Sequence, residues 1–204
     1  TSVTDPLSHL TTTVYDAVGN VIAMIDALGI RTTYNYDAEQ QLLTVKNAQN
    51  NVTTYSYDAV GNRTTIKDAL NNVTTYVYDE LHRRVNTIEP NGSKTTFVYD
   101  AAGQMTNLID PNSNKTTFVY DALGRQTKEI DALNKTITYT YNAIDQLTQK
   151  KDRRSQTIDY TYDDEGKLTG QVWKNSGGTT TNTVTYTYDD ADRLLTARDG
   201  QGAY

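Results

Sequence analysis

Residues 52–61 read Val-Thr-Thr-Tyr-Ser-Tyr-Asp-Ala-Val-Gly, and this stretch decides the fold of the chain. In its first six residues Thr53, Tyr55 and Tyr57 alternate with Val, Thr and Ser, so the aromatic side chains share one face of an extended strand. The next four residues are typical of a tight turn. The Asp side chain can accept a hydrogen bond from the backbone two residues on, and Gly61 can adopt a positive φ. The stretch therefore predicts a β-strand with one aromatic face that ends in a hairpin turn.

The Tyr-Asp pair of this stretch recurs along the chain with a constant step of 21 residues from residue 15 to residue 162. The last copy follows after 26 residues, and we expect the five extra residues to form a longer loop within Asn175–Thr181. A fixed period of this length is the signature of a repeat architecture. The predicted structural repeat markers are Tyr15, Asp16, Tyr36, Asp37, Tyr57, Asp58, Tyr78, Asp79, Tyr99, Asp100, Tyr120, Asp121, Tyr141, Tyr162, Asp163, Tyr188 and Asp189.

A second turn signal keeps the same step between the Tyr-Asp pairs. It begins at Asp5, Asp26, Asn47, Asp68, Glu89, Asp110, Asp131 and Asp152. Each repeat is therefore predicted to be a strand, a tight turn, a second strand and a second tight turn. The predicted turn glycines are Gly19, Gly61, Gly103, Gly124 and Gly166. Gln40, His82, Asp145 and Asp192 stand in the place of glycine, so we expect their turns to be looser or strained.

These patterns predict an all-β fold in which tandem 21-residue β-hairpin repeats form one continuous curled or spiralling antiparallel sheet. We expect roughly 16 to 18 short strands, essentially no helix, and a single array of about nine repeats over residues 1–204. The array starts and ends in mid-repeat, which indicates a fragment of a longer array. A ladder of inward aromatic side chains is expected two residues before each marker Tyr, at Tyr34, Tyr55, Tyr76, Phe97, Phe118, Tyr139, Tyr160 and Tyr186.

The composition favours a folded chain that uses tyrosine as its main apolar residue. Its 204 residues include 16 Tyr, 2 Phe and 1 Trp, and the net charge is only −6. The absence of cysteine excludes disulfides and thiolate chemistry. The sequence shows no run of about 18 apolar residues and no charged-then-apolar leader, so neither a transmembrane helix nor a signal peptide is predicted. The mild acidity is no reason to expect a nucleic-acid partner.

No catalytic, cofactor-binding or metal-binding residues are predicted, and the chain is not expected to be an enzyme. Turn geometry accounts for nearly every Asp and Glu, and His9 and His82 lie far apart in turn-like positions. Asp, Asn and Gly turns are also found in calcium-binding repeats, but the required spacings are missing, so hydrogen-bonded turns are the favoured interpretation. Trp173 lies beside the insert at Asn175–Thr181, which makes this region the best candidate for a locally distinct contact.

The motifs YDAVGN (15–20), TTYSYD (53–58) and YDALGR (120–125) resemble those of the RHS or YD-repeat family, over nearly the whole chain. Members of that family include bacterial polymorphic toxins, shell components of insecticidal toxin complexes, wall-associated proteins and teneurins. The resemblance implies a long sheet of successive hairpins that spirals into a hollow shell. Such a shell can enclose a toxic C-terminal domain, and some members of the family are linked to carbohydrate binding.

The function predicted from these features is a structural repeat scaffold, a section of a shell, stalk or fibre on a secreted or cell-surface protein. The alternative is a carbohydrate-binding surface on the aromatic face of the repeats. Expected partners are other repeats of the same or neighbouring chains, an encapsulated toxin domain or a cell-surface glycan, with no nucleic acid and no membrane span. The expected location is extracellular or at the cell surface.

Overall fold

The computed structural model describes residues 2–4, 10–200 and 202–203. Asp5 and His9 lie outside these residues. The described residues contain twenty β-strands and no helix, which confirms the all-β prediction. The count exceeds the expected 16 to 18 because a short strand lies near each end, β1 (Ser2–Thr4) and β20 (Gly202–Ala203), in addition to the strands that flank the Tyr-Asp turns.

The chain divides into two compact units, residues 1–97 and residues 98–204. After β1, the first unit contains β2 (Leu10–Tyr15), β3 (Val21–Ile25), β4 (Arg31–Tyr36), β5 (Leu42–Lys46), β6 (Val52–Tyr57), β7 (Arg63–Lys67), β8 (Val73–Tyr78) and β9 (Arg84–Ile88). The division between the units falls inside β10 (Lys94–Tyr99).

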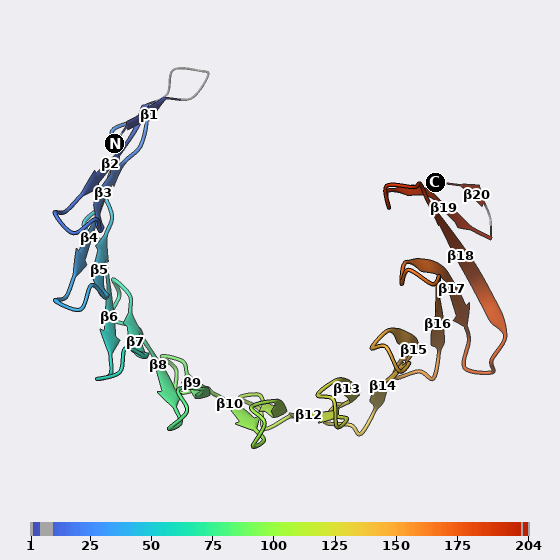
Figure 1. Ribbon diagram of the computed structural model, residues 1–204. Coiled ribbons are helices and arrows are strands. Elements are labelled where there is room, and N and C mark those ends of the chain that lie inside the picture. Colours follow the sequence, from blue (N-terminus) through green and yellow to red (C-terminus); the bar gives the residue numbers. More distant parts are fainter. Residues whose placement is uncertain (1, 5–9, 201, 204) are drawn as a thin grey trace. The chain divides into compact units, whose positions relative to one another are not determined.

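Before β20, the second unit contains β11 (Met105–Ile109), β12 (Lys115–Tyr120), β13 (Gln126–Ile130), β14 (Thr136–Tyr141), β15 (Leu147–Lys151), β16 (Thr157–Tyr162), β17 (Leu168–Lys174), β18 (Thr180–Tyr188) and β19 (Leu194–Asp199). Within each unit, strands that are neighbours in sequence are neighbours in the sheet, as Figure 1 shows. The units are therefore built from tandem hairpins, as predicted.

The two hairpins of a repeat differ in register. In the hairpin of β6 and β7, Tyr55 pairs with Ile66, and the register then shifts so that Tyr57 pairs with Arg63. In the hairpin of β5 and β6 the pairing runs without a shift. All these pairs are antiparallel, and an extra residue on one strand of a pair is a β-bulge. The bulge therefore falls at the marker tyrosine, beside the Tyr-Asp turn.

The fourth residue of each described turn has a left-handed backbone. Eight glycines there have φ between 78° and 97°, and nine other residues have φ between 59° and 68°. The amide of this fourth residue donates to the carbonyl of the first, as in Gly61 to Asp58 at 3.1 Å. These are the features of a type I turn closed by a bulge at the left-handed residue. Both turns of the repeat use the same geometry.

The prediction that Asn175–Thr181 forms a longer loop is wrong. Asn175 to Gly178 form the usual tight turn, with the amide of Gly178 donating to the carbonyl of Asn175 at 2.9 Å. The extra residues lengthen the strands: β17 has 7 residues and β18 has 9, where the corresponding strands of other repeats have 5 and 6. An antiparallel hairpin can grow in this way because each added pair of residues gains ladder hydrogen bonds, whereas a longer loop gains none.

The structure has almost no fully buried residues. Among the described residues only Ala23 and Gly170 are buried, and the aromatic side chains of the expected ladder are all partly exposed. The rings of the ladder are therefore half-buried and form no closed core. The reason is that a sheet without a second layer of structure covers each side chain only with its neighbours in the sheet.

The described part of the chain also holds no helix that could cross a membrane.

Candidate functional site

The marker tyrosines join each repeat to the one before it. The hydroxyl of Tyr57, at the end of β6, donates to the backbone carbonyl of Leu42 at the start of β5, 3.0 Å away and 15 residues earlier. The same bond, at 2.9 to 3.0 Å, is made by Tyr36, Tyr78, Tyr120, Tyr141, Tyr162 and Tyr188. For Tyr188 the separation is 20 residues, because the five inserted residues lie between the partners. We call this bond the tyrosine clasp.

The clasp requires a phenol, since phenylalanine would place an equal ring without the donor. Burial raises the pKa of Tyr57, Tyr120 and Tyr162 above the usual value of 10.0. The phenols are therefore neutral and can donate at neutral pH. Of the remaining predicted markers, Tyr15 is 47% exposed at the end of β2, and Tyr99 ends β10.

The marker aspartates hold the Tyr-Asp turns together. One carboxylate oxygen of Asp58 accepts the amide hydrogens of Val60 and Asn62, at 3.1 and 2.9 Å. The other oxygen accepts the side-chain amide of Asn62 at 2.9 Å. These bonds, the one from the Asn62 side chain first, lower the pKa of Asp58 below 3.8. The carboxylate thus satisfies three donors that the short turn would otherwise leave to water.

Other residues at the first and fifth turn positions reproduce this arrangement. In the turns of Asp79, Asp121 and Asp189 the fifth residue is an arginine, and its guanidinium donates to the carboxylate of the aspartate. Asn142, which replaces aspartate, accepts two amide hydrogens with its side-chain oxygen and donates its own amide to Gln146 at 2.7 Å. Asp16, Asp37, Asp100 and Asp163 likewise accept the amide of the residue four positions on.

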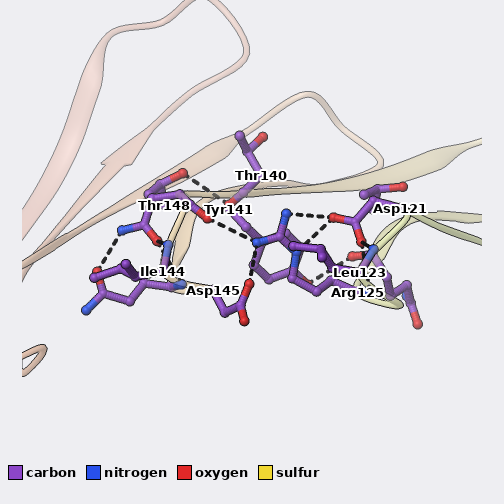
Figure 2. Close-up of polar contacts among 12 residues, drawn as sticks. Asp121, Leu123, Arg125, Thr140, Tyr141, Ile144, Asp145 and Thr148 are labelled. Atoms are coloured by element: carbon purple, nitrogen blue, oxygen red, sulfur yellow. Dashed lines mark hydrogen bonds and ion pairs between the residues drawn. The ribbon is translucent and has the colours of Figure 1, made fainter.

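The fifth residue of a Tyr-Asp turn also contacts the fourth residue of the next such turn. Figure 2 shows the contact at Arg125. Its guanidinium binds Asp121 of its own turn at 2.7 Å, and reaches the next turn at the carboxylate of Asp145 and the carbonyl of Asn142, at 2.7 and 3.0 Å. It also lies 4.8 Å from the centre of the Tyr141 ring. One arginine therefore ties two successive turns to a marker tyrosine.

These contacts explain the residues that replace glycine in the turns. The side-chain amide of Asn62 donates to Nδ1 of His82 at 3.0 Å, and Asp192 pairs with Lys167 at 2.7 Å. The expectation that these turns are looser is wrong, because their closing hydrogen bonds, at 3.0 to 3.3 Å, match those of the glycine turns. The strain of a positive φ remains, at 60° to 66° for Gln40, His82, Asp145 and Asp192. At three of these residues a bond to the preceding turn compensates part of this strain.

The predicted turn glycines lie at this same contact. The side chains of Gln41, Gln104 and Gln146 lie over Gly61, Gly124 and Gly166, so that a Cβ at each glycine would be 3.2 to 3.8 Å from them. Gly19 has open space around it, and Gly103 has a φ of 84°. Sequence reasoning missed this contact between turns. No signal in the sequence distinguishes this contact, because a polar residue stands 20 positions before Gly61 and Gly124 as well as before His82.

Arginine side chains lie between successive aromatic rings of the first unit. The guanidinium of Arg63 is 5.8 Å from the centre of the Tyr55 ring and 5.4 Å from that of Tyr76. Arg84 is 5.7 Å from Tyr76 and 4.9 Å from Phe97. These distances are within the range of cation–π interactions. The expected aromatic ladder is therefore interleaved with cations in this unit.

The described residues hold no cluster of metal-ligating side chains. No three His, Asp or Glu side chains of the described residues gather closely enough to hold a metal ion. The carboxylates with lowered pKa are those bonded within turns or ion pairs, as at Asp58 and Asp121. What the repeated side chains do in this structure is join one hairpin to the next.

Three solved structures share this fold over nearly the whole chain. The crystal structure of TcdB2-TccC3-TEV is 17% identical with a TM-score of 0.77, over 94% of this chain and 11% of that chain. TcdB2-TccC3 without its hypervariable C-terminal region is 15% identical with a TM-score of 0.61, over 98% and 14%. The Photorhabdus luminescens Tc holotoxin pore is 15% identical with a TM-score of 0.57, over 94% and 14%. The chain thus spans a small part of the length of these proteins.

Family models agree with the repeat pattern. No curated protein matches the chain. A model described as RHS Repeat matches residues 141–172, and a model described as Teneurin YD-shell matches residues 2–149. The second match covers well over half of the 204 residues. The chain therefore belongs to the YD-shell family, and the resemblance to RHS and YD-repeat proteins is confirmed.

Proposed function

We propose that this chain is a section of the wall of an RHS/YD-type shell, stalk or fibre on a secreted or cell-surface protein. The chain would have a structural role, in which it holds successive hairpins side by side in a continuous sheet. Residues 1–204 would act as a single array in this role. The side chains that recur every 21 residues form hydrogen bonds within turns or between neighbouring repeats. This use of the recurring residues supports a scaffold and not an enzyme.

The tyrosine clasp is the observation that carries this proposal. At least seven marker tyrosines of the described residues donate to a carbonyl of the preceding repeat with nearly the same length. In a repeat array each unit is stabilised by its neighbours, so such a joint adds to the interface term at every step. A wall needs this property, because its weakest joint sets its resistance to opening.

A finer proposal is that the wall encloses a toxic domain of the same protein. Support comes from the solved structures of similar fold, which include a Tc holotoxin pore, and from the family resemblance. The chain spans 11% to 14% of those proteins, so the enclosed segment would lie in the rest of a longer protein.

Protease protection tests the enclosure in the full-length protein. The segment that follows the repeats should resist cleavage in the native protein and be cleaved rapidly when expressed alone. Mutating two clasps, Tyr57→Phe and Tyr162→Phe, should increase its cleavage, whereas Tyr55→Phe should not. Equal cleavage of the segment in the native protein and alone would refute enclosure. If the clasp variants and Tyr55→Phe have the same free energy of unfolding, the clasps do not hold the repeats together and the proposed scaffold role of the clasps is refuted.

The alternative function, sugar binding along the whole aromatic face, has less support. Arg63 and Arg84 lie over rings that a sugar would need to contact. A general sugar platform would leave those ring faces open. The scaffold is therefore the function that the geometry supports best.

A further inference from the structure

Within each unit the turns of the sheet lie in two rows. The strand that ends at a marker tyrosine leads into a Tyr-Asp turn, and the next strand runs back to a turn of the second kind, as β14, β15 and β16 do. We call the row of Tyr-Asp turns the Tyr-Asp rim and the row of second turns the opposite rim. Neighbouring strands lie about 4.8 Å apart, so the turns of either rim recur about every 10 Å. The two rims therefore have the same period.

The second and third residues of a turn carry side chains that the turn itself does not use. In the turn of Asp58 the side chain of the first residue accepts the hydrogen bonds, Gly61 adopts the left-handed backbone, and the side chain of Asn62 donates to the first residue. The third residue, Val60, contributes only its backbone amide. Side chains at these two positions are therefore available for a contact outside the turn.

Large apolar side chains occupy the third position on both rims. They are 66% to 72% exposed on the Tyr-Asp rim, at Val60, Leu81, Leu123 and Ile144, and 79% to 81% exposed on the opposite rim, at Leu70 and Leu133. A type I turn does not require an apolar residue at this place, and water disfavours one there. One such side chain alone is ordinary, but a row with a fixed spacing indicates a surface for a partner of the same period.

The opposite rim of the second unit is basic. The turns that begin at Asp110, Asp131 and Asp152 keep these three carboxylates half-buried and bonded within the turn. The exposed charged side chains of these turns and of the residues directly beside them are all cationic, namely Lys115, Lys135, Lys151, Arg153 and Arg154. Arg153 binds Glu129 and Asp131 of its own chain. The three exposed lysines extend past the turn carboxylates.

The Tyr-Asp rim of the same unit is acidic. In the turns that begin at Asp121, Asn142, Asp163 and Asp189, the exposed charged side chains are Asp145, Asp164, Glu165, Asp190, Asp192 and Arg193. The charge of Arg193 is met by Asp189 at 2.7 Å. Asp164, Glu165 and Asp190 stand at the second and third turn positions, so the turns themselves do not need these carboxylates.

The charges of the two rims cannot neutralise each other within one chain. β13 has 5 residues and β14 has 6, so the rims are separated by roughly 17–20 Å. The Debye length at physiological ionic strength is about 8 Å, so attraction across the sheet is screened. Rims of opposite charge and equal period are complementary, in contrast, when they belong to two different chains.

We propose that the Tyr-Asp rim of one chain docks along the opposite rim of a second copy of this chain. Carboxylates such as Asp164 and Asp190 would lie against Lys135 and Lys151, and apolar side chains such as Ile144 would lie against those of the other rim. Each pair of turns would contribute little, but the contributions would add along the rims because the two periods agree. Unlike rims meet, so the contact is head-to-tail and not two-fold symmetric.

Sedimentation velocity of the 204-residue chain tests the docking through its dependence on salt. At about 0.1 M NaCl the weight-average sedimentation coefficient should rise with protein concentration. At about 1 M NaCl the Debye length falls from about 10 Å to about 3 Å, and the association constant should fall about tenfold or more. A strict monomer at the lower salt concentration would refute the docking. Association of equal strength at both salt concentrations would refute it as well, because backbone pairing of end strands would explain that result.

An exchange of charges tests whether the two rims meet each other. Lys135→Glu with Lys151→Glu places carboxylates on both rims, and Asp164→Lys with Asp190→Lys places lysines on both rims. Each double variant should self-associate about tenfold more weakly than the unaltered chain. An equimolar mixture of the two should recover association, because each altered rim then finds a rim of opposite charge. A mixture that associates no better than either variant alone would refute the complementarity.

Two single variants locate the contact. Lys128→Glu is the matched control for Lys135→Glu, because Lys128 is an exposed lysine in the middle of β13, away from both rims. It should leave association unchanged, and a loss as large as that of Lys135→Glu would refute the assignment to the rims. Ile144→Asn should weaken association at both salt concentrations, and no change would refute the apolar part of the contact.

Urea midpoints measured in parallel separate association from folding. Unchanged midpoints establish that the charge variants are folded, and the salt dependence of the unaltered chain decides the docking where a variant does not fold. The docking goes beyond the proposed scaffold function. Because the tyrosine clasp is tested by unfolding and the docking by association, the failure of one leaves the other standing.

Discussion

Replacing Tyr57 by Phe removes one tyrosine clasp and almost nothing else. The ring keeps its place, but the hydroxyl that donates to the carbonyl of Leu42 at 3.0 Å is lost. A hydrogen bond of this kind contributes about 0.5–1.5 kcal/mol net to the free energy of unfolding. The carbonyl of Leu42 lies in a partly buried place, so water only partly replaces the lost partner. We therefore expect Tyr57→Phe to lower the free energy of unfolding by about 1 kcal/mol.

Urea denaturation followed by circular dichroism measures this loss. The midpoint should fall while the slope m stays constant, because the variant exposes no extra surface on unfolding. For a chain of this size the melting temperature should fall by about 2–4 °C per kcal/mol. The matched control is Tyr55→Phe on the same strand, since the Tyr55 hydroxyl makes no hydrogen bond within the described residues. If the two variants lose equal stability, the clasp does not stabilise the repeat interface.

The clasp also predicts a dependence on alkaline pH. Burial raises the pKa of Tyr57 in the folded state above its ordinary value of 10.0. The unfolded chain therefore loses its phenolic proton at a lower pH than the folded chain. The stability is fully present below pH 10 and is lost as the pH rises through the folded-state pKa. Tyr57→Phe should reduce this alkaline loss, which a series of urea midpoints against pH would measure.

Three further predictions concern the turns and the faces of the sheet. The pKa of Asp121 is lowered, chiefly by its hydrogen bond with Arg125, so its contribution to stability is present above its ordinary pKa of 3.8 and is lost as the pH falls through the lower folded-state value. Melting temperatures measured against pH should fall in acid, and fall less in Asp121→Asn; identical curves would contradict this. Asp145→Gly removes the strain of a φ of 66°, about 1–2 kcal/mol, and an exposed ion pair worth at most about 1 kcal/mol. The urea midpoint should therefore rise, and a fall would mean that the bond to Arg125 outweighs the strain. Tyr76→Ala should cost about 2–3 kcal/mol and Val77→Ala, which is already 38% exposed, under about 1 kcal/mol by the same assay. The reverse order would mean that the faces are exchanged.

Features that depend on a few neighbouring residues were predictable. The side chain of Asp58 bonds to amides two and four residues on, and Gly61 closes the same turn, so both act within five residues. Such turn chemistry reads directly from sequence, and its recurrence every 21 residues predicts the hairpins without knowledge of the surroundings. The alternation of the strands likewise places Tyr55 and Tyr57 on one face.

The hydrogen-bond partner of a long side chain was not predictable from the sequence. That the hydroxyl of Tyr57 bonds to Leu42 depends on how one hairpin lies beside the previous one, and nothing in the sequence near either residue specifies this. The placement of the insertion in the strands β17 and β18, and the cavity of about 270 Å³ that Trp173 lines beside them, have the same origin. Partial exposure of the rings followed from a single layer, which periodicity cannot distinguish from a sheet with a covered face.

The sequence by itself determined the repeat, its two turns and its all-β character, because these rest on hydrogen bonds and backbone conformations within a few residues. Only the tertiary structure decided which atoms join successive repeats, how deeply the aromatic rings are buried, and where the broken period leaves a cavity. Those properties depend on contacts between residues 15 to 25 positions apart, whose energies are comparable for many partners. The packing of neighbouring hairpins, and no local preference, selects among them.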